Sequence, residues 1–257
     1  MIDLHTHVLP GLDDGARTLE DSLAMVRMAA AAGTTDIVAT PHADETFDFH
    51  PDAAAQAIEQ VQQACGASPR LHYGCELNLT VDLIEDVLRA PERYTIGHGP
   101  YLLVEFSNFL VPKGIGGVFA RMIAAGIRPL IAHPERNPIL RKRVELLQEW
   151  VAQGCAMQVT AQSLTGRFGK SAKSAGDRLL AKGLVHVIAS DAHDTLHRPP
   201  LLDEAWKYLE ITFDSEAAHR LLVRNPQAVL EGRAVETVAL SPRRRPWYAF
   251  WNTRASR

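Results

Sequence analysis

The chain has 257 residues, of which 46% are apolar and 22% charged, as in an ordinary soluble globular protein. Its formal net charge of −3 gives no global basic field, so we expect no nucleic-acid partner. No apolar run approaches the ~18 residues of a membrane-spanning helix. The N-terminus MIDLHTHVLPGLDDG is too polar for a signal peptide, and we expect a cytoplasmic protein.

The three cysteines are too few and too widely spaced for a disulfide framework or a zinc ribbon, which fits a reducing compartment. They are Cys65, Cys75 and Cys155. None is followed by an arginine six residues later, which the Cys-x5-Arg loop of thiol-dependent phosphatases requires. That spacing excludes the thiol route to phosphate ester hydrolysis.

Predicted strands and helices alternate along the chain. Apolar, β-branched runs predict strands at a short start ending with Asp3 and Leu4, and at 35–40, 71–79, 101–106, 128–132, 156–160 and 185–190. Apolar spacing and composition predict helices at 19–30, 52–64, 81–89, 115–125, 140–151 and 173–182, and in most of the remainder to about 232. Thr18, with Asp21 three residues later, is the expected first N-cap, and Gly33 ends that helix.

Repeated β-then-α units predict a parallel sheet that is covered by helices. About seven such units, with no linker rich in Gly, Pro or Ser, predict one barrel-like α/β domain over residues 1–240. A doubly wound open sheet is the alternative. The absence of a glycine-rich phosphate turn after the first strand disfavours it.

Residues 241–257, SPRRRPWYAFWNTRASR, differ from the rest in having arginines and aromatic residues but no acid. We interpret this tail as a strap whose aromatic side chains pack on the barrel. The alternative is a docking segment for an acidic partner or, peripherally, for an anionic membrane face.

Side chains that bind metals follow the predicted strands. Each candidate lies at, or within a few residues of, the carboxyl end of a strand, which is the end that carries the active site in parallel barrels. The candidates are His5, His7, Asp13 or Asp14, His42, Glu76, Glu105, His133, Asp191 and His193. Glu76 and Glu105 lie in apolar strands, where an unpaired carboxylate is costly. The sequence therefore predicts a metal site at one rim of the barrel.

Roughly nine donors exceed the needs of one ion, so we expect two or three divalent ions with a bridging carboxylate. Closely spaced ions make hydroxide available at neutral pH, which favours hydrolysis, especially of phosphoesters. Arg136, three residues after His133, and Arg198, five after His193, match phosphate oxygens in geometry. We interpret both arginines as phosphate-binding catalytic residues.

Four segments resemble the PHP (polymerase and histidinol phosphatase) superfamily: DLHTHVLPGLDDGA at the start, TPH at 40–42, HPER at 133–136 and SDAH at 190–193. Within it the chain is most similar to the bacterial PHP-type protein tyrosine phosphatases of capsule and exopolysaccharide systems, the CpsB/CapC-like group. The likeness covers about residues 1–232, and the tail lies outside it.

The resemblance implies a distorted (β/α)7 TIM-like barrel with a trinuclear metal centre. His5, His7, Glu76 and Asp191 would hold one ion, Glu76 would bridge to a second ion held by Glu105 and His133, and Asp14, His42 and His193 would hold the third. The spacing of the family favours Asp14 over Asp13. Arg136 and Arg198 match the phosphate-binding arginines of the family.

The resemblance also implies Mn as the metal, with Zn, Fe and Mg as alternatives. It implies that the partner is the phosphotyrosine tail of a bacterial tyrosine kinase that controls capsule or exopolysaccharide synthesis. Self-association into a homo-oligomer stays open at this stage.

Other functions use a similar set of residues. Hydrolysis of histidinol phosphate or another small phosphate ester needs the same metals, and a non-catalytic regulator could bind phosphotyrosine without turning it over. Nuclease activity is disfavoured by the acidic net charge. Amidohydrolases share the His-x-His pattern, but two arginines beside the ligands favour a phosphate substrate over a neutral amide.

Overall fold

The computed structural model describes residues 1–242, apart from the side chains of Val81 and Asp82. The strands in this part of the chain are β1 (Ile2–Thr6), β2 (Asp36–Ala39), β3 (His42–Ala43), β4 (Arg70–Tyr73), β5 (Glu76–Asn78), β6 (Tyr101–Glu105), β7 (Arg128–Ile131), β8 (Ala156–Thr160) and β9 (Val187–Ala189). Except for Ser241 and Pro242, the predicted tail lies outside the described residues.

Ten α-helices connect and cover these strands within residues 1–242. They are α1 (Leu19–Ala31), α2 (Pro51–Cys65), α3 (Val81–Arg89), α4 (Ile115–Ala124), α5 (Val144–Gln153), α6 (Ala161–Thr165), α7 (Gly169–Ala181), α8 (Asp203–Thr212), α9 (Ser215–His219) and α10 (Asn225–Leu230). Short 3-10 turns lie at Pro91–Arg93, Ile96–His98 and Leu140–Lys142, and a π-helical turn lies at Arg220–Arg224.

The strands form a distorted (β/α)7 barrel. All pairings are parallel, in a sheet of order β1-β2-β4 and a second of order β3-β5-β6-β7-β8-β9. β3 follows shortly after β2, and β5 shortly after β4. Each of these two bent segments therefore contributes one strand to each sheet. A parallel bridge between Thr6 and Ala192 joins the first strand to the segment after β9. The predicted fold class is therefore confirmed.

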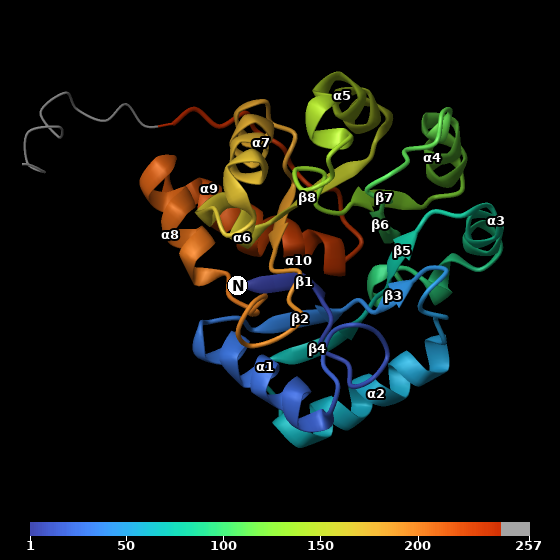
Figure 1. Cartoon of the computed structure of the whole chain (residues 1–257), viewed down its shortest axis with the longest axis vertical. Coiled ribbons are helices and arrows are strands. Elements are labelled where there is room, and N and C mark those ends of the chain that lie inside the picture. The colour runs from blue at the N-terminus through green and yellow to red at the C-terminus, as the bar shows by residue number, and fades with distance from the viewer. Residues whose placement is uncertain (243–257) are drawn as a thin grey trace, which may run out of the picture.

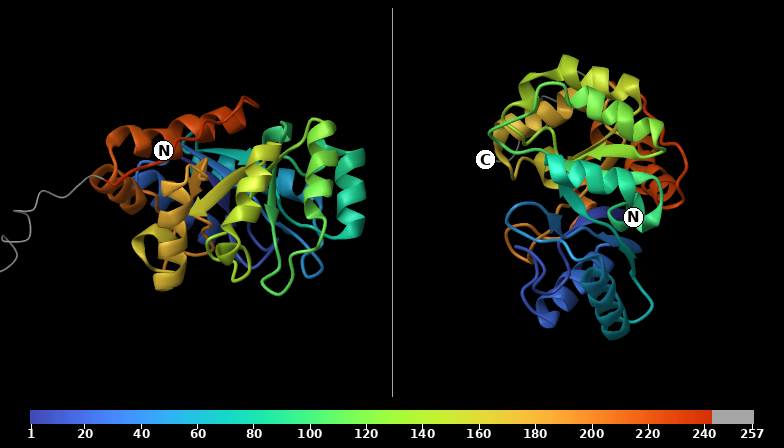
Figure 2. Two further views of the ribbon diagram at one scale, coloured as in Figure 1. Left: turned by 90° about the horizontal axis from the view of Figure 1, so that it is seen from above. Right: turned by 90° about the vertical axis from the view of Figure 1, so that its right-hand side faces the viewer.

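The helices lie outside the barrel. Figure 1 shows α1 and α2 beside the three-stranded sheet, and α3, α4, α5 and α7 around the six-stranded one. The two turned views in Figure 2 show the same arrangement from the top and the side. Because every strand runs in the same direction, all carboxyl ends meet at one face. Within residues 1–242, no helix combines the length and the apolar character that a bilayer span needs.

Local sequence signals explain several element boundaries. Thr18 and Asp21 form the predicted capping box, in which each side chain accepts a hydrogen bond from the backbone of the other residue. The predicted strand 71–79 is interrupted at Gly74, where an added Cβ would lie 2.7 Å from Val38 Cγ1. This close approach requires glycine and divides the strand into β4 and β5.

Two predicted helices differ most from the structure at their starts. The helix predicted at 140–151 is a 3-10 turn at Leu140–Lys142 followed by α5, which begins at Val144. The helix predicted at 173–182 begins at Gly169, and α6 precedes it directly after β8. Ala172, Ala175 and Gly176 are buried against the barrel, and such small residues contribute little to an apolar periodicity. A prediction from the spacing of larger apolar side chains therefore does not include the first turn of α7.

Aromatic packing stabilises the outer layer on one side of the barrel. Phe119 of α4 is fully buried and meets the rings of Phe106 and Trp150 edge to face, with centroids 6.2 and 5.2 Å apart. Phe106 also stacks on Trp150 at 5.4 Å. This cluster joins α4 and α5 to the loop that follows β6.

Replacing Phe119 by Ala should therefore lower the free energy of unfolding by about 3–5 kcal/mol, because it removes a fully buried ring and leaves a cavity. Denaturant unfolding monitored by circular dichroism measures the effect. The control is Phe109→Ala, a loop residue that is 93% exposed, for which we expect a change within about 0.5 kcal/mol. Equal losses in the two variants would contradict this account of the core.

Candidate metal centre

Nine predicted ligand side chains converge at the carboxyl ends of the strands. They form three groups, each with one nitrogen or oxygen per residue and all these atoms within 4.8 Å of one another. The groups are His5 with Glu76, His133 and Asp191; His7 with Asp14, His42 and His193; and His42 with Glu76 and Glu105. Residues separated by almost 190 positions thus share one site.

The first group is buried and centred on Glu76. Its Oε2 lies 3.0 Å from His5 Nε2, and its Oε1 lies 2.9 Å from His133 Nε2. Asp191 Oδ1 lies 3.3 Å from His5 Nε2. None of these side chains is more than 8% exposed. Two carboxylates and two imidazoles therefore share a buried space.

The second group lies nearer the surface. Asp14, which is 51% exposed, places Oδ1 3.2 Å from His193 Nε2 and 3.5 Å from His42 Nε2. The resemblance had assigned His7 to the set with His5 and Asp191. In the structure His7 groups with Asp14, while its Nε2 also lies 3.3 Å from Glu76 Oε2 and 3.5 Å from Asp191 Oδ1. His7 thus lies between the two groups.

The third group connects the other two. His42 Nδ1 lies 3.3 Å from Glu76 Oε2 and 4.0 Å from Glu105 Oε2. Glu76 belongs to the first and third groups, and His42 to the second and third. One carboxylate can therefore face more than one ion, which is the arrangement that a bridged cluster needs.

The donor atoms fit divalent cations. Glu76 Oε2, Asp191 Oδ1 and His42 Nδ1 are buried and have no hydrogen-bond partner. His5 Nε2 and His7 Nε2 face each other at 3.2 Å. Buried polar atoms without partners are costly, and cations placed among these atoms would remove that cost.

Hydrogen bonds behind the ligands orient three of the histidine rings. His7 Nδ1 donates to Asp13 Oδ2 at 2.6 Å, and His5 Nδ1 donates to Gln158 Oε1 at 3.2 Å. His193 Nδ1 donates to the backbone carbonyl of Asp191 at 3.2 Å. With the proton on Nδ1, each ring directs the lone pair of Nε2 into the cluster, as metal-binding histidines do.

The pKa values of two histidines favour metal binding. Burial, followed by the positive charge of Arg136, lowers the pKa of His133 to about 3. Burial, followed by the charge of His7, lowers the pKa of His193 to about 3. Both rings are neutral at pH 7 and retain a lone pair. Burial also lowers the pKa of His7, but Asp13 and Glu76 outweigh it and raise the value to about 9, so a cation there displaces a proton.

The third group shows why positive charge is needed. Burial, followed by repulsion from Glu76, raises the pKa of Glu105 to about 7. The like charges of two neighbouring carboxylates account for part of this shift. A cation between them would favour the ionised form of both.

Backbone conformation at two strand ends is unusual. His133, directly after the Ala132 that follows β7, has φ of 32°, and Asp191, two residues after β9, has φ of 54°. Residues other than glycine rarely adopt positive φ. Both belong to the buried first group, and such strain is typical of residues held in place at functional sites.

The two predicted arginines converge on one carboxylate of the cluster. Arg198 Nη2 lies 2.5 Å from Asp191 Oδ2, and Arg136 Nη1 pairs with the same oxygen. The Arg136 guanidinium also lies 4.4 Å above the ring of Phe168. Two guanidinium groups thus face the cluster from the same side, where they could bind the oxygens of a phosphoryl group.

Several residues around the ligands were not assigned these roles from the sequence. Asp13, considered only as an alternative ligand, holds His7 and accepts hydrogen bonds from the backbone N–H groups of Gly15 and His42. Gln158 accepts a hydrogen bond from His5. In the sequence, the indication of such a role is that Gln158 is a polar residue within an apolar strand. Glu135 accepts hydrogen bonds from Ser163 Oγ and Thr160 N and anchors the loop that carries Arg136.

Comparison with known proteins places this chain among capsule-system proteins. Residues 1–231 match the family described as "Capsular polysaccharide synthesis, CpsB/CapC". Tyrosine-protein phosphatase YwqE of Bacillus subtilis (strain 168) is 34% identical over 256 residues, which cover 98% of this chain and 100% of that protein. Tyrosine-protein phosphatase CpsB of Streptococcus agalactiae is 31% identical, with 91% and 100% covered.

Solved structures agree with the sequence comparison. The structure described as one of YwqE from Bacillus subtilis and CpsB from Streptococcus pneumoniae, "unique metal-dependent tyrosine phosphatases", superimposes with a TM-score of 0.86 at 33% identity, covering 95% of this chain and 100% of that one. A probable 2-pyrone-4,6-dicarboxylic acid hydrolase from Acinetobacter baumannii, 18% identical with 90% and 98% covered, superimposes at 0.57. The second likeness concerns the fold alone.

Asp13→Asn should weaken metal binding about 10–100-fold, because it removes the carboxylate that fixes the Nδ1 proton and the orientation of His7. Titration of the metal-stripped chain with Mn²⁺ measures the affinity, and circular dichroism checks the fold. Asp48→Asn is the matched control, since Asp48 is 89% exposed and pairs with His50 instead. The role of Asp13 would be refuted by equal Mn²⁺ affinities in the two variants.

Proposed function

Because the chain belongs to the CpsB/CapC family, we propose that it is a metal-dependent protein tyrosine phosphatase acting in a capsule or exopolysaccharide system. The observation that carries this proposal is the joint geometry of the three ligand groups and the two arginines at one barrel rim. Ligand groups alone would suit many hydrolases. The arginines add a requirement for an anionic group such as phosphate.

We propose that all nine ligand side chains act together and hold two to three divalent ions. Mixed imidazole and carboxylate donors suit Mn²⁺, which we favour, and also Zn²⁺, Fe²⁺ or Mg²⁺. When bound, the ions would supply a water of lowered pKa and neutralise negative charge on the phosphoryl group. The ligands are His5, His7, Asp14, His42, Glu76, Glu105, His133, Asp191 and His193.

The chain itself binds and orients the substrate. Arg136 and Arg198 bind the phosphoryl oxygens and neutralise charge that develops on them in the transition state. Phe168 restrains the guanidinium of Arg136 from below. Asp13 keeps a proton on His7 Nδ1, so that Nε2 remains a donor to metal. A phenol leaving group, with a pKa of ~10, needs less protonation than an aliphatic alcohol.

The cysteines are unsuited to act as nucleophiles. Burial, followed by the charge of Glu76, raises the pKa of Cys75 well above its ordinary value. Burial raises the pKa of Cys155 to about 12, and it also raises that of Cys65. A nucleophilic cysteine needs a lowered pKa. The thiolate route that the spacing excluded is therefore also disfavoured by the surroundings of each sulfur.

The substrate that we propose is a phosphorylated tyrosine tail of a bacterial tyrosine kinase, encountered in the cytoplasm. Relatives are named tyrosine-protein phosphatases, and the family is described as one of capsular polysaccharide synthesis. The basic aromatic tail at residues 241–257 would make a peripheral contact with an acidic partner or an anionic membrane face, and self-association of the chain is compatible with the proposal.

Chelation should abolish hydrolysis of an aryl phosphate, and added Mn²⁺ should restore it, because the reactive water depends on bound cations. Alkylation of the thiols should leave the rate unchanged. Activity that survives EDTA but is lost on alkylation would overturn the proposed chemistry. A phosphotyrosine peptide and histidinol phosphate, compared by kcat/KM, separate the proposed substrate from the small-molecule alternative. A preference for histidinol phosphate would reject the protein substrate.

Arg136→Ala should lower kcat on an aryl phosphate by ~10²-fold or more while metal content is retained, because one donor to the transition state is lost. Steady-state kinetics and elemental analysis of the same sample provide both readouts. Arg167→Ala, an exposed arginine beside Phe168, is the control and should retain the wild-type rate. An unchanged kcat in Arg136→Ala would remove this residue from the active site.

A further inference from the structure

A basic hollow lies outside the metal centre and has no role in the proposed reaction. It has a volume of about 320 Å³ and lies between the 3-10 turn before α5 and residues 170–178 of α7. We call it the basic cavity, and its polar lining residues are Arg141, Lys142, Lys170, Ser171, Ser174 and Arg178. We propose that this cavity binds a second phosphoryl group on the same substrate chain whose phosphotyrosine enters the metal centre. The inference rests on the proposed function.

The charge of the cavity is unbalanced. Four cationic side chains line it together with two serine hydroxyls, and no carboxylate contributes to its wall. Among the described side chains, no carboxylate lies within 4.0 Å of the charged nitrogens of Arg141, Lys142 or Lys170. On the same helix, Lys173 is paired with Asp177 at 3.5 Å and does not line the cavity. The protein as a whole carries −3, so this concentration of positive charge is local.

The cavity walls are held together by the fold. Arg178 Nη2 on α7 donates a hydrogen bond to the backbone carbonyl of Arg141 in the 3-10 turn. This contact joins the two elements that form the cavity and leaves Lys142 and Lys170 exposed to solvent. A ligand therefore meets positive groups from two elements whose relative position is fixed.

A short stretch of chain links Arg136 to the basic cavity. Phe168, which lies under the guanidinium of Arg136 at 4.4 Å, directly precedes α7. Lys170 is two residues further, which is at most ~7 Å of chain. A peptide whose phosphotyrosine is held by Arg136 therefore has its neighbouring residues within reach of this surface.

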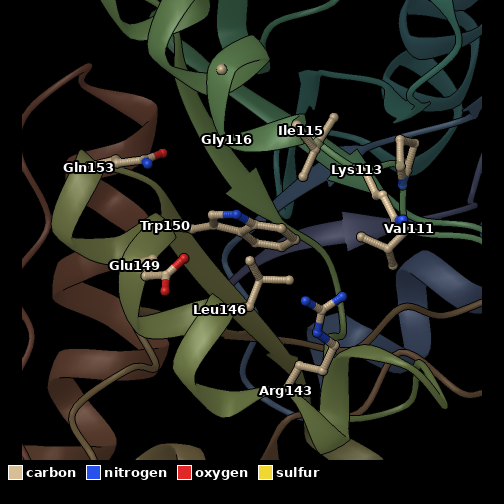
Figure 3. A pocket seen from close by; sticks show the side chains of 12 residues that line it. Val111, Lys113, Ile115, Gly116, Arg143, Leu146, Glu149, Trp150 and Gln153 are labelled. Carbon is tan, nitrogen blue, oxygen red and sulfur yellow. The ribbon is translucent and has the colours of Figure 1, made fainter.

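The neighbouring hollow between α4 and α5 makes a useful contrast (Figure 3). It has a volume of about 360 Å³ and carries Lys113 and Arg143, but Glu149 also lines it. Leu146 and Trp150 supply apolar surface there. The carboxylate and the apolar lining make this hollow a poorer site for a doubly charged anion.

A phosphoryl group suits the basic cavity better than a single carboxylate or a membrane. It carries a charge of −1.5 to −2 near neutral pH and three acceptor oxygens, which ammonium, guanidinium and hydroxyl donors can satisfy together. These donors lie beside Phe168, which packs on Arg136, and this position favours a group of the bound substrate over a bilayer. The basic cavity would thus favour substrates that carry two phosphotyrosines over those that carry one.

The test measures binding without turnover, using peptides that carry one or two phosphonomethyl-phenylalanine residues and the metal-loaded full chain. We expect the wild type to bind the peptide with two groups at least ~10-fold more tightly than the peptide with one. The double variant Lys142→Ala, Lys170→Ala should reduce this ratio to within ~2-fold. Lys113→Ala with Lys182→Ala removes the same charge from exposed sites outside the cavity and should retain the wild-type ratio.

Two results would overturn the inference: an unchanged ratio in the cavity variant, whether or not both affinities fall, or an equal loss of the ratio in the control variant. A wild type without preference for two groups, but with Lys142- and Lys170-dependent binding to phosphatidylserine vesicles, would assign the surface to a membrane instead. Since binding is measured without hydrolysis, an inactive enzyme would refute the proposed function while leaving this test intact.

Discussion

The crowding of carboxylates and imidazoles around Glu76 is the constraint on which the site depends. Glu76 Oε2 lies within 3.3 Å of nitrogen atoms of three histidines, yet it has no hydrogen-bond partner, and Asp191 Oδ1 nearby has none either. In a buried setting such an arrangement is costly unless positive charge is added between the donors. Divalent cations fulfil that requirement, and the same cations would activate water. The crowding of donors that calls for positive charge therefore also supports the proposed chemistry.

The barrel makes this crowding achievable. Parallel strands place their carboxyl ends on one face, so each strand or the loop that follows it can contribute a ligand without a long excursion. The backbone is strained at His133 and Asp191, two ligands of the buried first group, because both have positive φ. A layer behind the ligands restrains them further, with Asp13 on His7 and Gln158 on His5. Ligand geometry is thus determined by the strands, the strained loops and this outer layer together.

Substrate recognition in the proposed function uses a surface that is locally positive in an acidic protein. Arg136 and Arg198 face the cluster, and Phe168 links Arg136 to the start of α7, where the basic cavity begins. The CpsB/CapC relatives are named tyrosine-protein phosphatases. In the proposed function, a substrate with several phosphorylated tyrosines would engage the metal centre and the basic cavity together.

The sequence by itself determined the family and the barrel, because DLHTH, HPER and SDAH are local patterns and the alternation of strands and helices is a local signal. Both predictions are confirmed. It also identified the side chains that gather at the rim, since position relative to strand ends is readable along the chain. It could not separate Asp13 from Asp14, or show that His7 lies between two ligand groups, because these depend on which way neighbouring side chains point. Only the tertiary structure decided that Asp14 faces His42 and His193 while Asp13 holds His7 from behind. The same holds for the basic cavity, whose residues come from two segments about 30 positions apart and acquire a common charge only when α7 packs beside the turn that precedes α5.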